Sequence, residues 1–142
     1  MSDLGLFKGR RVLLTGHTGF KGMWLALLLL RAGAEVTGFA LDAPTEDGTE
    51  ALRRLGILKE LRDVRGDVCE LSALRRAFEE ARPEIVFHLA AQPIVRTSYR
   101  QPVDTFATNV MGTVNLLECV RTSDTVRSVL IVTTDKVYEN KE

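Results

Sequence analysis

Short apolar runs alternate with longer helical patterns along these 142 residues. Runs rich in aliphatic and β-branched residues predict strands at 11–15, 35–40, 64–66, 85–90 and 129–133. Between them, an apolar helix follows a glycine-rich turn and stops at Gly33, and further helices are predicted at 49–55, 70–81 and 102–121. Strands alternating with helices imply right-handed crossovers and a parallel sheet covered on both faces. The pattern predicts an α/β, doubly wound domain with strand order 3-2-1-4-5.

Composition narrows the classes of partner. The 45% hydrophobic content supports one globular domain, and nineteen basic residues balance nineteen acidic ones. No long-range field therefore favours nucleic acid or an anionic membrane, and the apolar run 23–30 is too short to span a bilayer. Cys69 and Cys119 lie in unrelated segments without metal-ligand spacing. We expect two free thiols in a reducing cytoplasm and no metal site.

The turn after the first predicted strand reads TGHTGFKG, with Gly16, Gly19 and Gly22 spaced three apart. The first glycine permits a tight turn, the second a close approach to a pyrophosphate, and the third packing of helix on strand. Lys21 precedes the last glycine, so this is not a Walker loop and phosphoryl transfer is not expected. The turn predicts dinucleotide binding at a helix N-terminus; the alternative is a turn whose glycines serve packing only.

Two charged or polar residues within this turn have more than one interpretation. His17 either donates to a pyrophosphate or crowds the place that a smaller residue would leave open, and crowding is favoured. Lys21 is interpreted as a solvated surface charge rather than a phosphate ligand.

Five stretches together resemble the extended short-chain dehydrogenase/reductase family, and within it the sugar-nucleotide dehydratases. They are TGHTGFKG (15–22), GDV (66–68), HLAAQ (88–92), TNVMGTVNLLE (108–118) and VTTDKVY (132–138). The resemblance runs from about Lys8 to the last residue. It implies that residues 1–142 are a Rossmann-like NAD-binding domain, the amino-terminal part of a longer enzyme, truncated before the later strands and the substrate domain.

The resemblance also implies a set of cofactor contacts. The glycine turn binds the NAD pyrophosphate, Asp67 and Val68 contact adenine, and the stretch after the fourth strand borders the riboses. The alternatives are that Asp67 caps the next helix and that Asn109 satisfies buried backbone. The implied set is Gly16, His17, Gly19, Phe20, Gly22, Asp42, Asp67, Val68, Leu89, Ala90, Ala91, Asn109 and Thr133.

The ribose contact departs from the family pattern. The usual acidic residue would fall near Ala40 and is absent, whereas Asp42 lies where NADP-using relatives tend to carry arginine. A carboxylate there would repel a 2′-phosphate, and no arginine is near to bind one. NAD is therefore the expected cofactor.

The resemblance implies dehydration of CDP-glucose to CDP-4-keto-6-deoxyglucose. Thr134 would hydrogen-bond the C4 oxygen, and Asp135 would be the general acid for the departing C6 hydroxyl, which requires a raised pKa. Lys136 stands where related dehydratases carry glutamate. It either removes the C5 proton, which requires a lowered pKa, or stabilises the enolate as a cation.

The family's YxxxK pair is missing, because Tyr138 is followed at the fourth position by Glu142. These residues alone are therefore expected not to turn over substrate. The rival interpretations are a non-catalytic NAD(P)-binding or redox-sensing module, and another dehydratase, reductase or epimerase of the same family.

The helix at 102–121 carries apolar residues on two sides. One stripe is expected to cover the sheet, and the other side to meet a second subunit of a homodimer. The first comprises Val103, Phe106, Val110, Val114, Leu117 and Val120, and the second Ala107, Met111 and Leu116.

Overall fold

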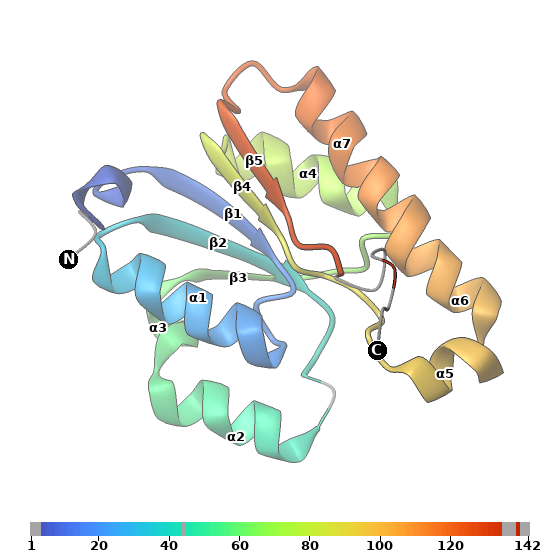
Figure 1. The fold of residues 1–142 in the computed structure, drawn as a ribbon. Coiled ribbons are helices and arrows are strands. Elements are labelled where there is room, and N and C mark those ends of the chain that lie inside the picture. Colours follow the sequence, from blue (N-terminus) through green and yellow to red (C-terminus); the bar gives the residue numbers. More distant parts are fainter. Residues whose placement is uncertain (1–3, 44, 135–138, 140–142) are drawn as a thin grey trace.

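The computed structural model of the chain describes residues 4–43, 45–134 and 139. Within these residues, five parallel strands form one sheet in the order β3-β2-β1-β4-β5, so the predicted order is confirmed (Figure 1). The strands are β1 (Arg11–Thr15), β2 (Glu35–Ala40), β3 (Arg62–Arg65), β4 (Ile85–His88) and β5 (Ser128–Ile131). The helical elements are η1 (Leu4–Phe7), α1 (Phe20–Arg31), α2 (Glu46–Leu55), α3 (Ile57–Glu60), α4 (Leu71–Ala81), α5 (Val95–Arg100), α6 (Pro102–Phe106), η2 (Ala107–Met111) and α7 (Gly112–Thr122).

Helices cover both faces of the sheet, which gives a Rossmann-like, doubly wound α/β domain (Figure 1). Val12 and Leu14 of β1 point to the face covered by α1, α2 and α3, whereas Leu13 points to the face covered by α4 and α7. This alternation follows from the two-residue period of a strand. Because β1 is central, its carboxyl end meets the ends of β2 and β4, where the strand order reverses.

Several boundaries differ from the predicted ones for local reasons. The helix predicted at 49–55 begins at Glu46, because Thr45 caps it by accepting a hydrogen bond from the Gly48 amide at 3.0 Å. Gly56 then adopts a left-handed conformation that separates α2 from α3. β4 ends at His88, two residues early: the Leu89 amide still donates to the Thr15 carbonyl, at 3.1 Å, but the Ala90 amide donates to the Thr15 hydroxyl instead. The sequence pattern did not predict α5.

The helix predicted at 102–121 is interrupted by the π-helical turn η2. The prediction of its buried side is wrong: Val103 and Phe106 are 78% and 68% exposed, whereas Leu116 is fully buried. The stripe is exposed on both sides of the turn, since Val114 and Leu117 are 48% and 44% exposed, although Val120 at its end packs against the core. The face against the sheet is instead built around Gly112, where a Cβ would lie 2.6 Å from Val68 Cγ2.

Across the residues that the structure describes, the helices are too short or too polar to cross a bilayer.

Candidate functional site

Gly16 lies where β1 passes beneath the loop that follows β4. Its φ is +78°, in the left-handed region that favours glycine, and its amide donates to the Phe39 carbonyl at 2.9 Å. A Cβ on Gly16 would lie 2.7 Å from the Ala90 nitrogen, and a Cβ on the buried Gly22 would collide with the Gly16 carbonyl. The first and third glycines are therefore required by the packing of strand, turn and helix.

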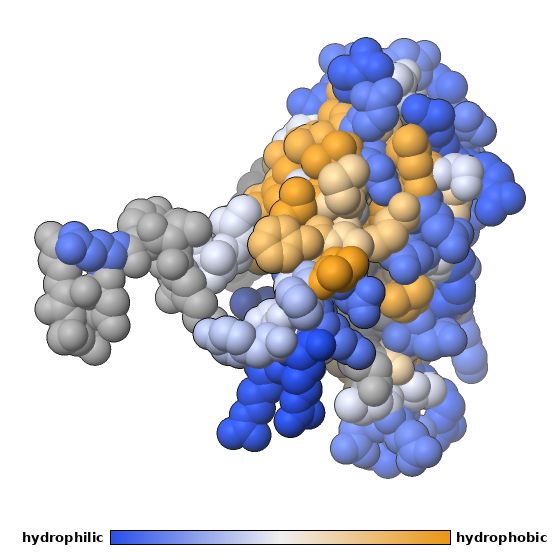
Figure 2. Space-filling view, turned by 90° about the vertical axis from the view of Figure 1, so that its right-hand side faces the viewer, coloured by the Kyte–Doolittle hydropathy of each residue, from blue (hydrophilic) through white to orange (hydrophobic). Residues whose placement is uncertain are grey.

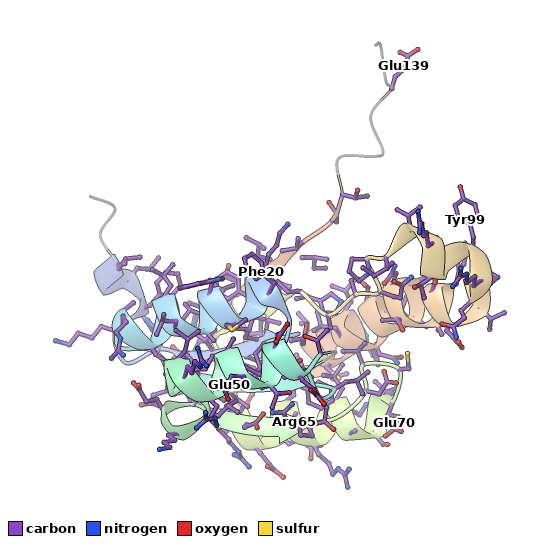
Figure 3. The ribbon with its side chains drawn as sticks, turned by 90° about the horizontal axis from the view of Figure 1, so that it is seen from below. Phe20, Glu50, Arg65, Glu70, Tyr99 and Glu139 are labelled. Carbon is purple, nitrogen blue, oxygen red and sulfur yellow. The ribbon has the colours of Figure 1, made fainter. Side chains whose placement is uncertain are left out.

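The second glycine has a different role. Gly19 is the N-cap of α1, and it makes no side-chain cap hydrogen bond. A Cβ there would meet only the Gly16 carbonyl, at 3.4 Å, so the space in front of it is open. The first-turn amides and the positive end of the helix dipole are thus left for an anion, and Phe20 beside them is 74% exposed (Figure 3). The turn fits the pyrophosphate of a dinucleotide.

His17 turns away from that open space. Its side chain is completely buried, and its ring packs against Gly38, where a Cβ would lie 2.6 Å from Nδ1. Nε2 lies 2.8 Å from Asp63 Oδ1 on β3. Burial lowers the pKa of His17 more than Asp63 raises it, so the ring is neutral near pH 7. The ring therefore neither donates to a pyrophosphate nor crowds it, and only the backbone of His17 remains a candidate cofactor contact.

The end of β2 is held by an arginine that sequence reasoning missed. Arg65 Nη1 donates to the Leu41 carbonyl at 3.2 Å and lies 3.3 Å from Asp42 Oδ1. The expectation that no arginine is near Asp42 is wrong, because parallel pairing of β2 with β3 places residue 65 beside residue 40. The alternating register of two paired strands is the signal that would have found it. Thr18 of the glycine turn also donates to the Leu41 carbonyl, at 3.0 Å.

Asp67 and Val68 follow β3 at the same edge of the sheet. Asp67 Oδ1 accepts from the Cys69 amide at 2.8 Å, which closes a turn before α4, and Glu70 rather than Asp67 is the N-cap of that helix. Asn115 Nδ2 donates to the carbonyls of Val68 and Cys69 at 2.9 and 3.1 Å. Asn115 is a second residue that sequence reasoning missed, and it fixes the segment expected to contact adenine.

His88 links the central strands to α7. The Thr15 Oγ1 atom accepts from the amides of Leu89 and Ala90, both at 3.2 Å, and lies 2.7 Å from His88 Nδ1. Its hydroxyl proton therefore points to Nδ1, and Nε2–H donates to Thr113 Oγ1 at 3.2 Å. Thr113 in turn donates to the Asn109 carbonyl at 2.8 Å. Burial lowers the pKa of His88, which agrees with this neutral tautomer.

Asn109 lies in η2 and clamps the loop after β4. Its Oδ1 accepts from the Gln92 amide at 2.8 Å, and its Nδ2 donates to the Gln92 carbonyl at 3.1 Å. Asn109 thus satisfies backbone groups, but these groups lie in an exposed segment rather than in the buried backbone that was expected. This clamp sets the path of the loop that contains the half-buried Leu89 and Ala90 and the exposed Ala91.

The strand expected to carry the catalytic residues lies at the edge of the described sheet. The Val132 amide donates to the His88 carbonyl at 3.0 Å, which continues the pairing of β5 with β4, and Thr133 and Thr134 are exposed. Asp135, Lys136 and Tyr138 lie outside the described residues. The other tyrosine, Tyr99 of α5, is 84% exposed and projects away from the sheet (Figure 3).

Cys69 contributes only its backbone to this arrangement, and neither cysteine thiol is among the groups expected to bind the cofactor or the sugar. Both are free thiols, and burial raises their pKa, to about 11 for Cys119. Among the described side chains, His, Cys, Asp and Glu form no group of three or more that could hold a metal ion.

A family model described as GDP-mannose 4,6 dehydratase matches residues 13–141. CDP-glucose 4,6-dehydratase from Salmonella typhimurium is 50% identical to the chain over 142 residues, which are 100% of the chain and 39% of that enzyme. The chain thus spans well under half the length of this relative.

Two solved structures share the fold. An epimerase from Methanothermobacter thermautotrophicus has a TM-score of 0.84 and 27% identity, and the match covers 99% of this chain and 40% of the epimerase chain. UDP-glucose 4-epimerase from Stenotrophomonas maltophila, with bound NAD and formylated UDP-arabinopyranose, has a TM-score of 0.77 and 23% identity, covering 94% of the chain and 39% of its own.

Proposed function

Because the chain belongs to the family described as GDP-mannose 4,6 dehydratase, we propose that it is the NAD-binding part of an enzyme that dehydrates CDP-glucose to CDP-4-keto-6-deoxyglucose. The observation that carries the proposal is the glycine turn, whose first and third glycines are fixed by packing while the second faces open space. The 50% identity to a CDP-glucose 4,6-dehydratase supports the choice of sugar nucleotide.

The residues of this chain would bind the cofactor in three places. The turn from Gly16 to Gly22 and the first amides of α1 would hold the pyrophosphate. Asp67 and Val68 would lie along the adenine, and Asp42 would accept from a ribose hydroxyl. When bound, NAD supplies the acceptance and return of a hydride, which the side chains of this domain do not provide.

The end of β5 would handle the sugar. Thr134 would donate to the C4 oxygen of the hexose, and Asp135 would deliver a proton to the departing C6 hydroxyl. Lys136 would take the C5 proton or stabilise the enolate that forms when it leaves. Because a YxxxK pair does not occur within the 142 residues, we propose that the chain alone binds cofactor without turnover.

Calorimetry and a product assay test the two parts separately. NAD is titrated into the purified chain, and CDP-glucose is then added with NAD while the 4-keto sugar is measured. Binding without product supports the proposal. Product formation by the 142 residues alone would contradict the proposal that they do not turn over substrate. A folded chain that does not bind NAD would contradict the proposed cofactor site.

We also propose that a second copy of the chain packs on the apolar face of α6 and α7. Figure 2 shows hydrophobic side chains gathered on this side of the molecule. Because Leu116 is buried, the surface available to a partner is the stripe that the sequence assigned to the sheet. Val120 of that stripe packs against the core, and the other five residues are 44% to 78% exposed: Val103, Phe106, Val110, Val114 and Leu117.

A further inference from the structure

A series of polar contacts runs from beneath the glycine turn to the surface at the end of β2. It begins at the His17 ring, passes to Asp63 at 2.8 Å, and continues from Asp63 Oδ2 to Arg65 Nη2 and Nε at 2.9 and 3.1 Å. Arg65 Nη1 then reaches the Leu41 carbonyl and Asp42. The first side chain is completely buried and the last is 94% exposed, so the contacts connect the interior to the site.

The His17 ring, at the buried end of this series of contacts, fixes the carboxylate of Asp63. The neutral His17 ring has one N–H, on Nε2, and that group donates to Asp63. Its Nδ1 has no hydrogen-bond partner among the described residues and lies against Gly38. The ring can therefore sit in this place only because residue 38 lacks a side chain, and it contributes a donor without adding a charge.

The fixed carboxylate in turn orients Arg65. Two donors of the guanidinium bind one oxygen of Asp63, and a third binds the Leu41 carbonyl, so the plane of the guanidinium is set. Its side chain is 35% exposed, and Arg65 lies at the end of β3 (Figure 3). In a doubly wound sheet, the end of the second strand is where the adenosine ribose of a dinucleotide is recognised.

The charges around this point favour a hydroxyl over a phosphate. Asp42 and Asp63 carry two negative charges, Arg65 carries one positive charge, and His17 is neutral, so the cluster has one net negative charge. A 2′-phosphate would meet that excess and the exposed Asp42 carboxylate. A ribose 2′-hydroxyl can instead donate to the same carboxylate.

We propose that Arg65 is a latent ligand for a 2′-phosphate, held in place by Asp63 and neutralised by Asp42, so that this chain selects NAD over NADP by local charge balance. The inference rests on the proposed dinucleotide-binding function. It assigns the discrimination to a balance between three side chains on two neighbouring strands and the loop that follows β2, rather than to one acidic residue.

The test is calorimetric titration of NAD and NADP into three variants of the chain. Wild type is expected to prefer NAD. Asp42→Asn keeps the size of the side chain and a hydrogen-bonding oxygen while it removes the charge, and it should raise the affinity for NADP relative to NAD by about tenfold. Asp42→Asn combined with Arg65→Gln should abolish that gain, because the guanidinium that binds the phosphate is gone.

Asp47→Asn is the matched control. Asp47 is an exposed carboxylate in the first turn of α2, and no contact ties it to Arg65 among the described side chains, so its loss should leave the NADP to NAD ratio unchanged. An unchanged ratio in Asp42→Asn, or a gain that survives Arg65→Gln, overturns the inference while NAD binding stands. If the folded wild-type chain does not bind NAD, the proposed function is overturned, and the inference with it.

Discussion

Two regions at the carboxyl edge of the sheet, the end of β1 and the end of β5, differ in how far their side chains are buried and hydrogen-bonded. At the end of β1 and in the turn that follows it, Thr15, His17 and Thr18 are at most 6% exposed. Their polar atoms bond to β4, to β3 and to the loop after β2, respectively. At the end of β5, Leu130 and Val132 are 49% and 44% exposed. The part of the site proposed to bind the cofactor is therefore held by contacts within this chain, whereas the part proposed to bind the substrate is not enclosed by the residues that the structure describes.

The largest effect is expected from Gly22→Ala in the glycine turn. The new Cβ would collide with the Gly16 carbonyl, and both groups belong to backbone that cannot move without separating α1 from β1. We expect a loss of about 3 kcal/mol in the free energy of unfolding, together with loss of NAD binding, measured by urea unfolding and calorimetry. An unfolding midpoint equal to that of wild type would show that the turn is not packed as described.

Gly19→Ala is the control that separates folding from binding. Its Cβ would make only an ordinary contact at 3.4 Å, so the unfolding free energy should change by less than about 1 kcal/mol. The methyl group would nevertheless stand in the open space in front of the α1 amides. NAD affinity should therefore fall by at least about tenfold while the protein stays folded.

Asn109→Ala tests how the other end of the sheet is held. It removes both hydrogen bonds to the Gln92 backbone, and we expect a loss of about 1 to 2 kcal/mol in the free energy of unfolding. Asn109→Asp keeps the acceptor for the Gln92 amide but sets a carboxylate oxygen against the Gln92 carbonyl, so it should also destabilise the loop. Equal unfolding curves for wild type and Asn109→Ala would mean that the clamp does not stabilise the loop.

The pH dependence of stability compares the two buried histidines. Burial lowers the pKa of both His17 and His88 below the usual 6.5, so the unfolded chain binds protons more readily. The unfolding free energy should therefore have its full value above about pH 6.5 and fall as the pH drops through the lower folded-state pKa values. Urea unfolding at about pH 7.5 and about pH 5.2 measures this fall.

Substituting each histidine separates the contributions of His17 and His88 to this fall in the unfolding free energy. His88→Gln should reduce the pH dependence in this window, and His88→Gln with His17→Gln should reduce it further. His88 is surrounded by threonine hydroxyls, whereas His17 also faces Asp63, which opposes the effect of burial. A larger reduction from His17→Gln alone than from His88→Gln alone would contradict this ranking.

The smallest effect on the folded chain is expected from Phe106→Ser. The side chain is 68% exposed, so the unfolding free energy of the monomer should change by less than about 0.5 kcal/mol. If a second copy packs on α6 and α7, sedimentation should show a dimer that this substitution weakens. A wild-type chain that remains monomeric at all concentrations would contradict the proposed dimer.

Periodicity and turn chemistry were sufficient to predict the strand order and the glycine turn, because both depend on local patterns of apolar residues and glycine. The positions of Arg65 and Asn115 were not predictable in the same way. Each acts on a segment more than twenty residues away in sequence, through strand pairing or the packing of α7 on the loop after β3. The direction of the His17 ring depends on Gly38, a residue that reads as an ordinary strand position.

The helix predicted at 102–121 also has features that the spacing of its apolar residues did not predict. Its apolar residues fit an uninterrupted helix, yet a π turn interrupts it at Ala107–Met111, and Phe106 before the turn and Val114 after it are both exposed. The spacing of apolar residues neither marks the turn nor distinguishes the face that packs on the sheet from the face that stays exposed.

An NAD titration followed by amide NMR measures whether the part of the site proposed for the cofactor forms within these residues. Saturable shifts are expected at residues 16–22 and 66–68, with the amides of α6 little changed. A folded chain whose spectrum does not respond to NAD, or responds mainly at α6, would contradict the proposed cofactor site.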